Sequence, residues 1–244
     1  MTQTKKVCGV LAAMAFLAVP YAHAQAPAPA TSKIFASVNM GAQLAPRTLA
    51  VASSQTVYDE TATLNASIPI GKGFQPDFGA GYRVWGNVFV GVTISYFTTT
   101  STADITAKVP DPLFFDRAKT TTSTQTGLKH SELAVIPQVI YSRALTDKID
   151  FVGGIGPAIV RLSQDSVSSF TVAPGTQNIV INNTSESASG TGVGASIGLN
   201  YNLDERLSIG ALIRYAPAKV QLPSAAAKQN VGGMQAGGGI RVNF

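Results

Sequence analysis

VGGMQAGGGIRVNF, residues 231–244, alternates between two kinds of side chain from Met234 to Phe244. Counting back from Phe244, every second residue is apolar or glycine, and the residues between them are polar or glycine. This period of two is the side-chain repeat of a β-strand. One apolar and one polar face are what a membrane-spanning strand needs, with lipid outside and a polar barrel interior inside. An edge strand of a soluble sheet would alternate too, so the rest of the chain has to decide between them.

The same alternation recurs along the chain and predicts further strands. Their apolar faces run over 34–42, 78–84, 88–96, 133–141, 193–201 and 207–215. Residues 149–162 are apolar as well, but the pattern leaves open which face looks outward. The connections at 85–87, 145–148 and 204–206 are short, and those near 97–127, 163–188 and 216–230 are long. Short periplasmic turns and long extracellular loops are typical of outer-membrane barrels.

The tyrosines fall at two levels of these predicted strands. Tyr82, Tyr141 and Tyr201 lie near the short turns, at the level where Phe244 ends the last strand. Tyr96 and Tyr215 each lie eight residues beyond the start of their strands, near the long loops. Eight residues at about 3.3 Å, tilted by about 45°, span roughly 19 Å, close to the height of an apolar membrane band. The spacing predicts two aromatic girdles.

The strand number follows from the need for an even count in a closed bacterial barrel. Counting 61–68 as a spanning strand gives nine. We therefore expect eight strands, with 46–75 a long first loop whose 61–68 stretch forms a hairpin arm above the membrane. Ten strands would need a further span that the sequence does not show. The expected fold is an all-β, closed antiparallel transmembrane β-barrel of residues 33–244.

Residues 1–24 have the layout of a secretory signal peptide, with Lys5 and Lys6, an apolar core and a small-x-small cleavage site at 22–24. Cys8 precedes the apolar core, so lipidation is not expected. Residues 25–32 form a Pro/Ala linker. Removal of the signal leaves 16 Lys and Arg against 13 Asp and Glu, a net charge of +3. The positive charges are dispersed along the chain, so the sequence does not predict a nucleic-acid-binding surface. The apolar core is too short to cross a bilayer as a helix, and no later window contains 18 apolar residues, so helical membrane spans are not expected.

The interior of an eight-stranded barrel is just wide enough for side chains to fill. The predicted inward residues are mostly small and polar, with a few long exceptions: Arg83, Glu132, Gln138, Arg214 and Arg241. A charge there should be paired. We expect Glu132 to centre a network with two or more of these arginines and to plug the barrel. The alternative is a narrow polar pore.

No catalytic, metal or cofactor site is expected. His130 and Ser131 are adjacent, so their side chains point to opposite faces of a strand and cannot act as base and nucleophile. His130 and Glu132 share a face and could form an ion pair. The sequence has no second mature histidine for a metal site and no nucleophile-elbow motif.

The long hairpin at 97–127 is the region most expected to carry the function, through contacts outside the membrane. Its arms, TTTST at 98–102 and again at 120–124, are symmetric about Asp111 and should pair as a ribbon above the membrane. Pro110 and Pro112 stiffen its tip, which carries Leu113, Phe114 and Phe115. These three residues either present an apolar contact surface or fold back onto neighbouring loops. The loop at 163–188 is expected to be solvated.

The hairpins GAGYRVWGNVFVGVTISYF (79–97) and GLNYNLDERLSIGALIRY (198–215), with the terminal GGGIRVNF, resemble small bacterial outer-membrane β-barrels of the eight-stranded membrane-anchor and adhesin kind. The match is partial, because the family's C-terminal signal prefers a polar residue where this chain has Gly237. The resemblance implies a non-enzymatic protein of the outer membrane, surrounded by its lipid and inserted by the barrel assembly machinery through the strand ending at Phe244. It also implies contact with a surface ligand or a partner cell.

Overall fold

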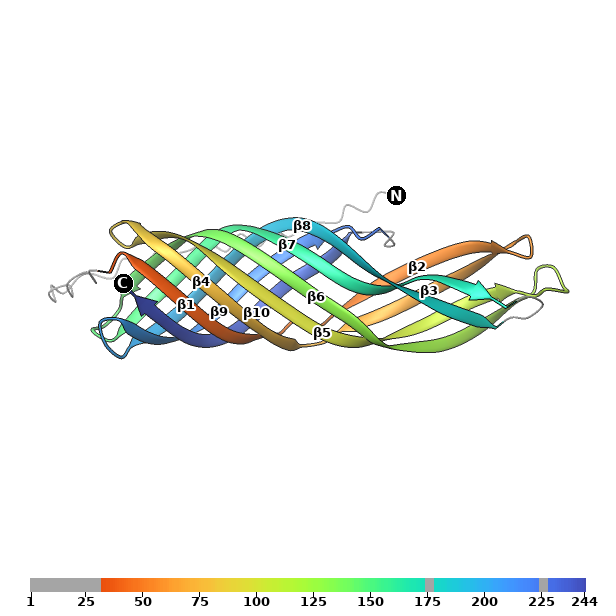
Figure 1. The fold of residues 1–244 in the computed structure, drawn as a ribbon, viewed down its shortest axis with the longest axis horizontal. Helices are drawn as coiled ribbons and strands as arrows, with labels where there is room; N and C mark the ends of the chain where they lie inside the picture. The colour runs from red at the N-terminus through yellow and green to blue at the C-terminus, as the bar shows by residue number, and fades with distance from the viewer. Residues whose placement is uncertain (1–31, 174–177, 224–227) are drawn as a thin grey trace, which may run out of the picture.

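The computed structural model describes residues 32–173, 178–223 and 228–244 (Figure 1). The expected signal peptide and all but the last residue of the expected linker lie outside these ranges. No helix in the described ranges is long and apolar enough to cross a membrane. Ten β-strands make up the described chain: β1 (Ile34–Gln43), β2 (Arg47–Val57), β3 (Glu60–Ile70), β4 (Gly73–Trp85), β5 (Val88–Pro110), β6 (Ala118–Ala144), β7 (Ile149–Val172), β8 (Ile179–Asn202), β9 (Leu207–Val220) and β10 (Gln229–Asn243).

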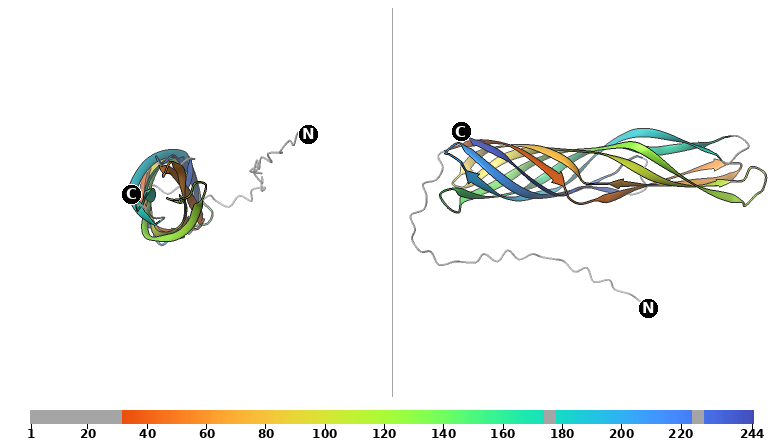
Figure 2. Two further views of the ribbon diagram at one scale, coloured as in Figure 1. Left: turned by 90° about the vertical axis from the view of Figure 1, so that its right-hand side faces the viewer. Right: turned by 90° about the horizontal axis from the view of Figure 1, so that it is seen from below.

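Eight of these strands close into a ring, in the order β1-β4-β5-β6-β7-β8-β9-β10, and every pair is antiparallel. The ring closes where β1 pairs with β10, for example Val38 with Ile240. The view along the barrel shows the closed outline (Figure 2). Strands β2 and β3 stand outside the ring as a hairpin that pairs with the outer part of β5. The predictions of eight barrel strands and of a hairpin arm at 61–68 are confirmed.

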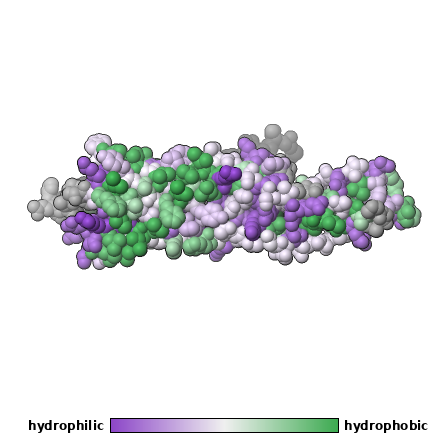
Figure 3. All heavy atoms as spheres, viewed as in Figure 1, coloured by the Kyte–Doolittle hydropathy of each residue, from purple (hydrophilic) through white to green (hydrophobic). Residues whose placement is uncertain are grey.

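The outer surface of the ring is an apolar belt. Most residues predicted to face outward are exposed, among them Val38 (46%), Val90 (45%), Ile197 (58%) and Ile240 (51%). Figure 3 shows apolar residues gathered over the left-hand half of the molecule, where the short turns lie. The structure also settles the orientation of β7, since Ile155 and Ile159 point outward. A closed ring with an apolar exterior satisfies its backbone internally and meets lipid, as a membrane span requires.

The aromatic residues predicted to form girdles all lie on this exterior and are 43–67% exposed: Tyr82, Tyr96, Tyr141, Tyr201, Tyr215 and Phe244. Tyr141 is paired with Val88, directly after the β4–β5 turn, whereas Tyr96 is paired with Leu133 further along the same ladder. We use the level of Tyr96 and Leu133 as the outer limit of the membrane span. The end of the barrel with the long hairpins is its outer side.

The long connections on the outer side are extended strands, as predicted for the paired ribbon at 97–127 but not for 163–188. Strands β5 and β6 continue past the membrane to Pro110 and Ala118, and β7 and β8 continue to Val172 and Ile179. The expectation of a solvated loop at 163–188 is therefore wrong. These extensions persist because they bury an apolar core of their own with the β2–β3 hairpin. That upper core includes Leu64, Ile68, Phe97, Ile105, Leu128, Val167 and Phe170.

The register of the β5–β6 ribbon differs from the symmetric pairing of the two TTTST arms. Thr98 pairs with Ser131, and Thr124 pairs with Asp104, so the arms do not face each other. The turn is centred near Phe114 rather than Asp111, and a bulge between Ser101 and Ala103 adjusts the register below it. The cause lies in the turn: Asp111 Oδ1 accepts hydrogen bonds from the backbone N–H of Leu113 (2.9 Å) and Phe114 (3.2 Å), which makes Asp111 the start of the turn.

One place in the barrel wall departs from a regular ladder. Pairing of β6 with β7 stops between Val135–Ile159 and Val139–Ile155, and the unchanged register places Pro137 opposite Pro157 in the gap. Neither proline has an N–H to donate. The wall nonetheless stays tight there, because a Cβ on Gly156 would lie 1.9 Å from the Pro137 carbonyl oxygen. Only a residue without a side chain fits between these two strands.

Candidate functional site

The outer mouth of the barrel is crossed by a cluster of polar groups around Glu132 of β6. Its Oε1 forms an ion pair with Nη2 of Arg47 and lies 2.6 Å from Nε2 of His130. Its Oε2 accepts a hydrogen bond of 2.9 Å from the backbone N–H of Gly232. Glu132 is only 4% exposed. The carboxylate therefore ties together β2, β6 and β10, which stand on different sides of the mouth.

His130 completes this cluster from β6 and is fully buried. Its Nδ1 contacts Oε1 of Gln164 in β7, and its ring packs edge-on against Phe97 with centroids 5.9 Å apart. A neutral imidazole carries one N–H, whereas its two nitrogens face oxygens of Gln164 and Glu132. Burial, and after it the charge of Arg47, whose Nη2 lies 3.2 Å from Nε2, lower the pKa of His130 to about 4. At neutral pH the ring therefore carries one N–H, which donates either to Gln164 or to Glu132 but not to both.

Gly232 gives β10 the shape that the cluster needs. Its φ of 70° lies in the left-handed region, which glycine adopts without strain. The carbonyl of Gly232 accepts hydrogen bonds from Nε2 of Gln43 (2.9 Å) and from Nη1 of Arg47. Burial lowers the pKa of Arg47 to about 10, so this guanidinium remains charged at neutral pH. The mouth cluster is thus Gln43, Arg47, His130, Glu132, Gln164 and Gly232.

The partners of Glu132 differ from those predicted. Its arginine is Arg47, which sequence reasoning placed in a loop and did not single out. Arg214 instead pairs with Asp77, through Nη1 and Oδ2 at 2.9 Å, and Asn39 donates to Oδ1 of the same carboxylate at 2.6 Å. The expected single network centred on Glu132 is therefore wrong. Among the described residues, the Glu132–Arg47 pair lies at the mouth and the separate Asp77–Arg214 pair lies deeper in the barrel.

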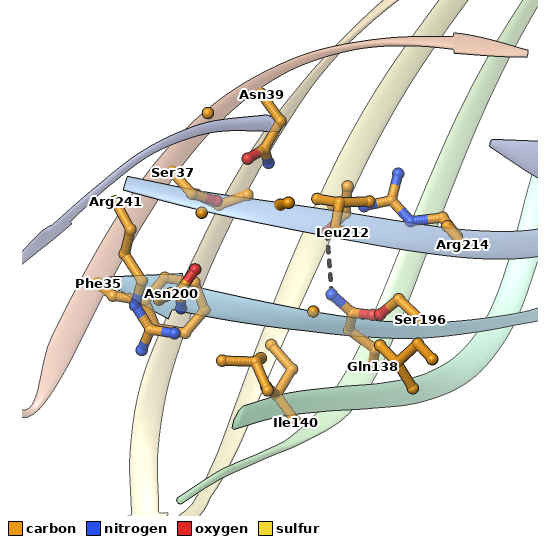
Figure 4. A pocket seen from close by; sticks show the side chains of 18 of the residues that line it. Phe35, Ser37, Asn39, Gln138, Ile140, Ser196, Asn200, Leu212, Arg214 and Arg241 are labelled. Atoms are coloured by element: carbon orange, nitrogen blue, oxygen red, sulfur yellow. Dashed lines mark hydrogen bonds between the residues drawn. The ribbon is translucent and has the colours of Figure 1, made fainter. Parts of the chain in front are cut away.

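Below the Asp77–Arg214 pair the barrel encloses a small polar cavity of about 80 Å³. Figure 4 shows Ser37, Asn39, Ser196 and Gln138 around it, with Arg214 and Arg241 toward opposite ends. Gln138, one of the predicted interior residues, donates from Nε2 to Oγ1 of Thr93 at 2.9 Å. The volume is enough for a few water molecules.

The inner end of the barrel is filled by stacked arginine and phenylalanine side chains. The guanidinium of Arg241 lies 3.9 Å from the ring centroid of Phe35, and that of Arg83 lies 5.0 Å from the centroid of Phe89. The two rings pack edge to face at 5.6 Å. Such cation–π contacts hold both arginines against the wall. Arg83 and Arg241 therefore belong to a layer distinct from either acid–arginine pair.

The outer part of the interior is less polar than predicted. Apolar residues of β6, β7, β9 and β10 form a buried cluster there, with Ala134, Ile136, Val160, Leu162, Ala218, Val220 and Val231 among its members. The sequence pattern predicts that Ala134 and Ile136 face inward, whereas it leaves the inward face of 149–162 open and predicts a long connection at 216–230. Along its axis, the barrel thus passes from stacked arginines through a polar cavity to apolar packing and the mouth cluster.

A second candidate site is the outermost turn, between β5 and β6, which we call the apolar tip (Leu113, Phe114 and Phe115). These residues are 82%, 55% and 74% exposed, so they do not fold back onto neighbouring loops. The turn is closed by a 2.8 Å hydrogen bond from the N–H of Asp111 to the carbonyl of Arg117. The guanidinium of Arg117 lies 5.1 Å from the Phe114 ring centroid. In the described part of the chain, no three His, Cys, Asp or Glu residues are grouped to hold a metal ion.

No protein-family model matches this sequence, and no curated protein does. Among solved structures, the chain is similar to Neisserial surface protein A, with 16% identity, 86% of this chain and 97% of that chain covered, and a TM-score of 0.47. The outer membrane protein OprG from Pseudomonas aeruginosa gives 11% identity, coverage of 87% and 96%, and a TM-score of 0.45. Ail, the attachment invasion locus protein of Yersinia pestis, gives 10% identity, coverage of 87% of this chain and 99% of that chain, and a TM-score of 0.39.

The closed ring and its apolar belt make this chain a transmembrane β-barrel of the outer-membrane type, independently of these likenesses. The outer membrane is the bilayer in which bacterial barrels of this architecture reside.

Proposed function

We propose that this outer-membrane barrel is non-enzymatic, that its interior is closed, and that it acts in envelope structure or in surface contact through the parts above the membrane. The observation that carries the proposal is the mouth cluster. Glu132 is bonded at once to Arg47, His130 and Gly232, which come from three strands around the mouth. A carboxylate held from several sides in a buried place resists displacement, because an unpaired charge there would be costly.

The non-enzymatic assignment is supported by the surroundings of His130. The imidazole is fully buried, and both ring nitrogens face side-chain oxygens of the mouth cluster. Ser131 lies on the next position of the same strand, where side chains point to the opposite face. A general base needs to reach the proton that it abstracts, and this ring does not face open solvent.

Surface contact is supported by the height of the outer ribbons. The four strands β5–β8 and the β2–β3 hairpin extend well beyond the outer aromatic level, to the right-hand end in Figure 1. The apolar tip is the outermost apolar feature of the β5–β6 ribbon, and we assign it the contact with a surface ligand or partner cell. The surrounding outer-membrane lipid meets the apolar belt. We also retain the barrel assembly machinery as the partner that engages the strand ending at Phe244.

A small passive pore is the second candidate, and the polar cavity favours it. In that case the inward-facing Arg83, Arg214 and Arg241 would make the pathway prefer anions. For ions to pass, the cavity would have to open to the outside past the mouth cluster and to the periplasm past the Arg241–Phe35 layer.

The conductance of the refolded mature protein in a planar lipid bilayer tests the closed interior. We expect no steady channel from the wild type and small leaks from Glu132→Ala, whereas Glu205→Ala in an exposed inner turn serves as the control. Steady conductance of the wild type would overturn the closed barrel in favour of the pore. Adhesion of cells carrying the protein, compared with cells carrying a tip variant, tests the surface role separately.

A further inference from the structure

The apolar tip is built to enter a lipid bilayer, and we propose that it inserts shallowly into the membrane of an apposed cell. This inference rests on the proposed surface role and names the class of partner. The target is the interface of a phospholipid bilayer, where apolar side chains lie between headgroups and cationic side chains lie among phosphates.

The tip cannot reach the membrane in which the barrel itself sits. Pro110, at the base of the turn, lies fourteen residues further along β5 than Tyr96, which is at the outer aromatic level. At about 3.3 Å per residue and a tilt of about 45° or less, this places the tip roughly 30–45 Å above the outer aromatic level. Figure 1 shows the β5–β6 turn at the end of the molecule opposite to the C-terminus. Its apolar surface therefore faces whatever lies outside the cell.

The conformation of the tip is fixed before any contact. Asp111 Oδ1 holds the N–H groups of Leu113 and Phe114, and Asp116 adopts a left-handed φ of 57°. The neighbouring hairpin braces the turn, since Oε1 of Glu60 accepts a 2.7 Å hydrogen bond from the N–H of Asp116. A preorganised turn loses little conformational entropy when its side chains are buried. Two separate hairpins thus hold three apolar side chains out into solvent.

The size of the patch favours lipid over a protein partner. A Phe side chain carries about 150–250 Å². With Phe114 and Phe115 exposed at 55% and 74% and Leu113 at 82%, the tip presents roughly 400 Å². A stable protein interface needs about 800 Å² from each partner. The patch is also a convex turn of consecutive residues rather than a groove. A small convex apolar turn can enter a bilayer interface without a matching pocket.

The charges around the tip suit zwitterionic headgroups. Arg117 stacks on Phe114, and Lys108 and Lys119 are exposed on the strands just below. Four acids offset these cations: Asp59, Glu60, Asp111 and Asp116. Two of the four carboxylates already accept backbone hydrogen bonds of the turn. Because the cations do not exceed the acids, binding should depend on apolar burial and only weakly on anionic lipid or salt.

Flotation with lipid vesicles tests the inference. The mature protein in nanodiscs is mixed with phosphatidylcholine vesicles, with or without 30% phosphatidylserine, and empty nanodiscs report the background. We expect the wild type to float with both kinds of vesicle, and the triple variant L113S/F114S/F115S to bind at least 10-fold less. The matched control is Val180→Ser, which removes a 60% exposed apolar side chain from the neighbouring β7–β8 ribbon and should bind like the wild type.

Depth is measured with Phe114→Trp in a Trp85→Phe background, where bromine-labelled lipids in the target vesicles should quench the single tryptophan. Binding that survives the triple variant, or tryptophan that is not quenched, would overturn the inference. Nanodiscs that pair with each other through the tip would also overturn it in favour of self-association. A third outcome is that the wild type does not bind vesicles while the triple variant loses adhesion to cells. The partner is then a protein, so the surface role stands and the lipid assignment fails. If the triple variant keeps both vesicle binding and cell adhesion, the lipid assignment and the surface role of the tip both fail.

Discussion

Pro137 of β6 lies opposite Pro157 on the neighbouring strand β7. The two strands keep one register on both sides of this point, from Leu133 to Tyr141. Each proline removes a backbone donor from the ladder, and both lie on the outer face of the wall. Proline is normally confined to edge strands, so a facing pair inside a closed ring is a local weakness. In lipid this weakness is larger, since no water replaces the missing donors.

Restoring these donors should stabilise the barrel. The double variant Pro137→Val/Pro157→Val can form two further ladder hydrogen bonds, and we expect about 1–3 kcal/mol of added stability. Urea unfolding in lipid vesicles measures it. Pro112→Val, in the turn that carries the apolar tip, controls for the general effect of removing a proline. A double variant no more stable than the wild type would show that the carbonyls at the gap are already satisfied.

The mouth cluster predicts a strong coupling between Glu132 and Arg47. Glu132→Ala leaves a buried guanidinium without its carboxylate and should cost about 3–5 kcal/mol in the free energy of unfolding. Arg47→Met should recover part of that loss when combined with Glu132→Ala, because the uncompensated charge is then gone. A double-mutant cycle by urea unfolding gives the coupling. Additive effects of the two substitutions would contradict the ion pair.

Gly156 should be among the least replaceable residues of the wall. A Cβ there would lie 1.9 Å from the Pro137 carbonyl oxygen and 2.8 Å from Cα of Gln138, which are backbone atoms that cannot move aside. We expect Gly156→Ala to lower the stability by about 3 kcal/mol or more and to reduce the folded yield. The shift between folded and unfolded bands in cold electrophoresis reports that yield. Gly71→Ala, where a Cβ meets nothing within 4 Å, should fold like the wild type.

The inner turn between β8 and β9 should respond to acid. Hydrogen bonds from the backbone N–H groups of Arg206 (2.7 Å) and Leu207 (2.6 Å) lower the pKa of Asp204. A lowered folded-state pKa means that the stabilisation is present above about pH 4 and is lost as the pH falls through the folded value.

Asp204→Asn removes the charge, so its stability should lie below that of the wild type at pH 7 and equal it near pH 2. Urea midpoints at the two pH values make the comparison. Asp147→Asn, in the turn where Thr146 Oγ1 accepts the backbone bonds, controls for the loss of a surface charge. A difference between Asp204→Asn and the wild type that does not change with pH would argue against this assignment.

The strands and their faces could be predicted because lipid enforces a period of two. The side chains from Val88 to Tyr96 alternate in exposure as their hydropathy does, and the short turns fix where each strand starts. Contacts between distant segments could not be predicted in the same way. Arg47 carries no local sign that it will meet Glu132, since the pairing depends on how the β2–β3 hairpin folds over the mouth.

The identical TTTST arms show a different limit. Because the two arms have the same sequence, we predicted that they pair with each other. The register of the ribbon is instead set by the turn, where Asp111 accepts hydrogen bonds from two backbone N–H groups. The apolar character of the upper ribbons was missed for a related reason. Val167 and Phe170 look like isolated apolar residues in a polar stretch, and they become a core only when β2 and β3 lie beside them.

The pairing of β1 with β10 constrains the order of assembly. Each hairpin from β4 to β10 brings together neighbours in sequence, but Phe35 must find Asn243 across about two hundred intervening residues. Closing so long a loop costs more entropy than any other step and is intrinsically slow. Until it happens, β1 and β10 each have an edge of unpaired N–H and C=O groups that hydrocarbon cannot satisfy. Insertion and closure are therefore coupled: the sheet gains its full stability in the bilayer only at the moment when its two ends meet.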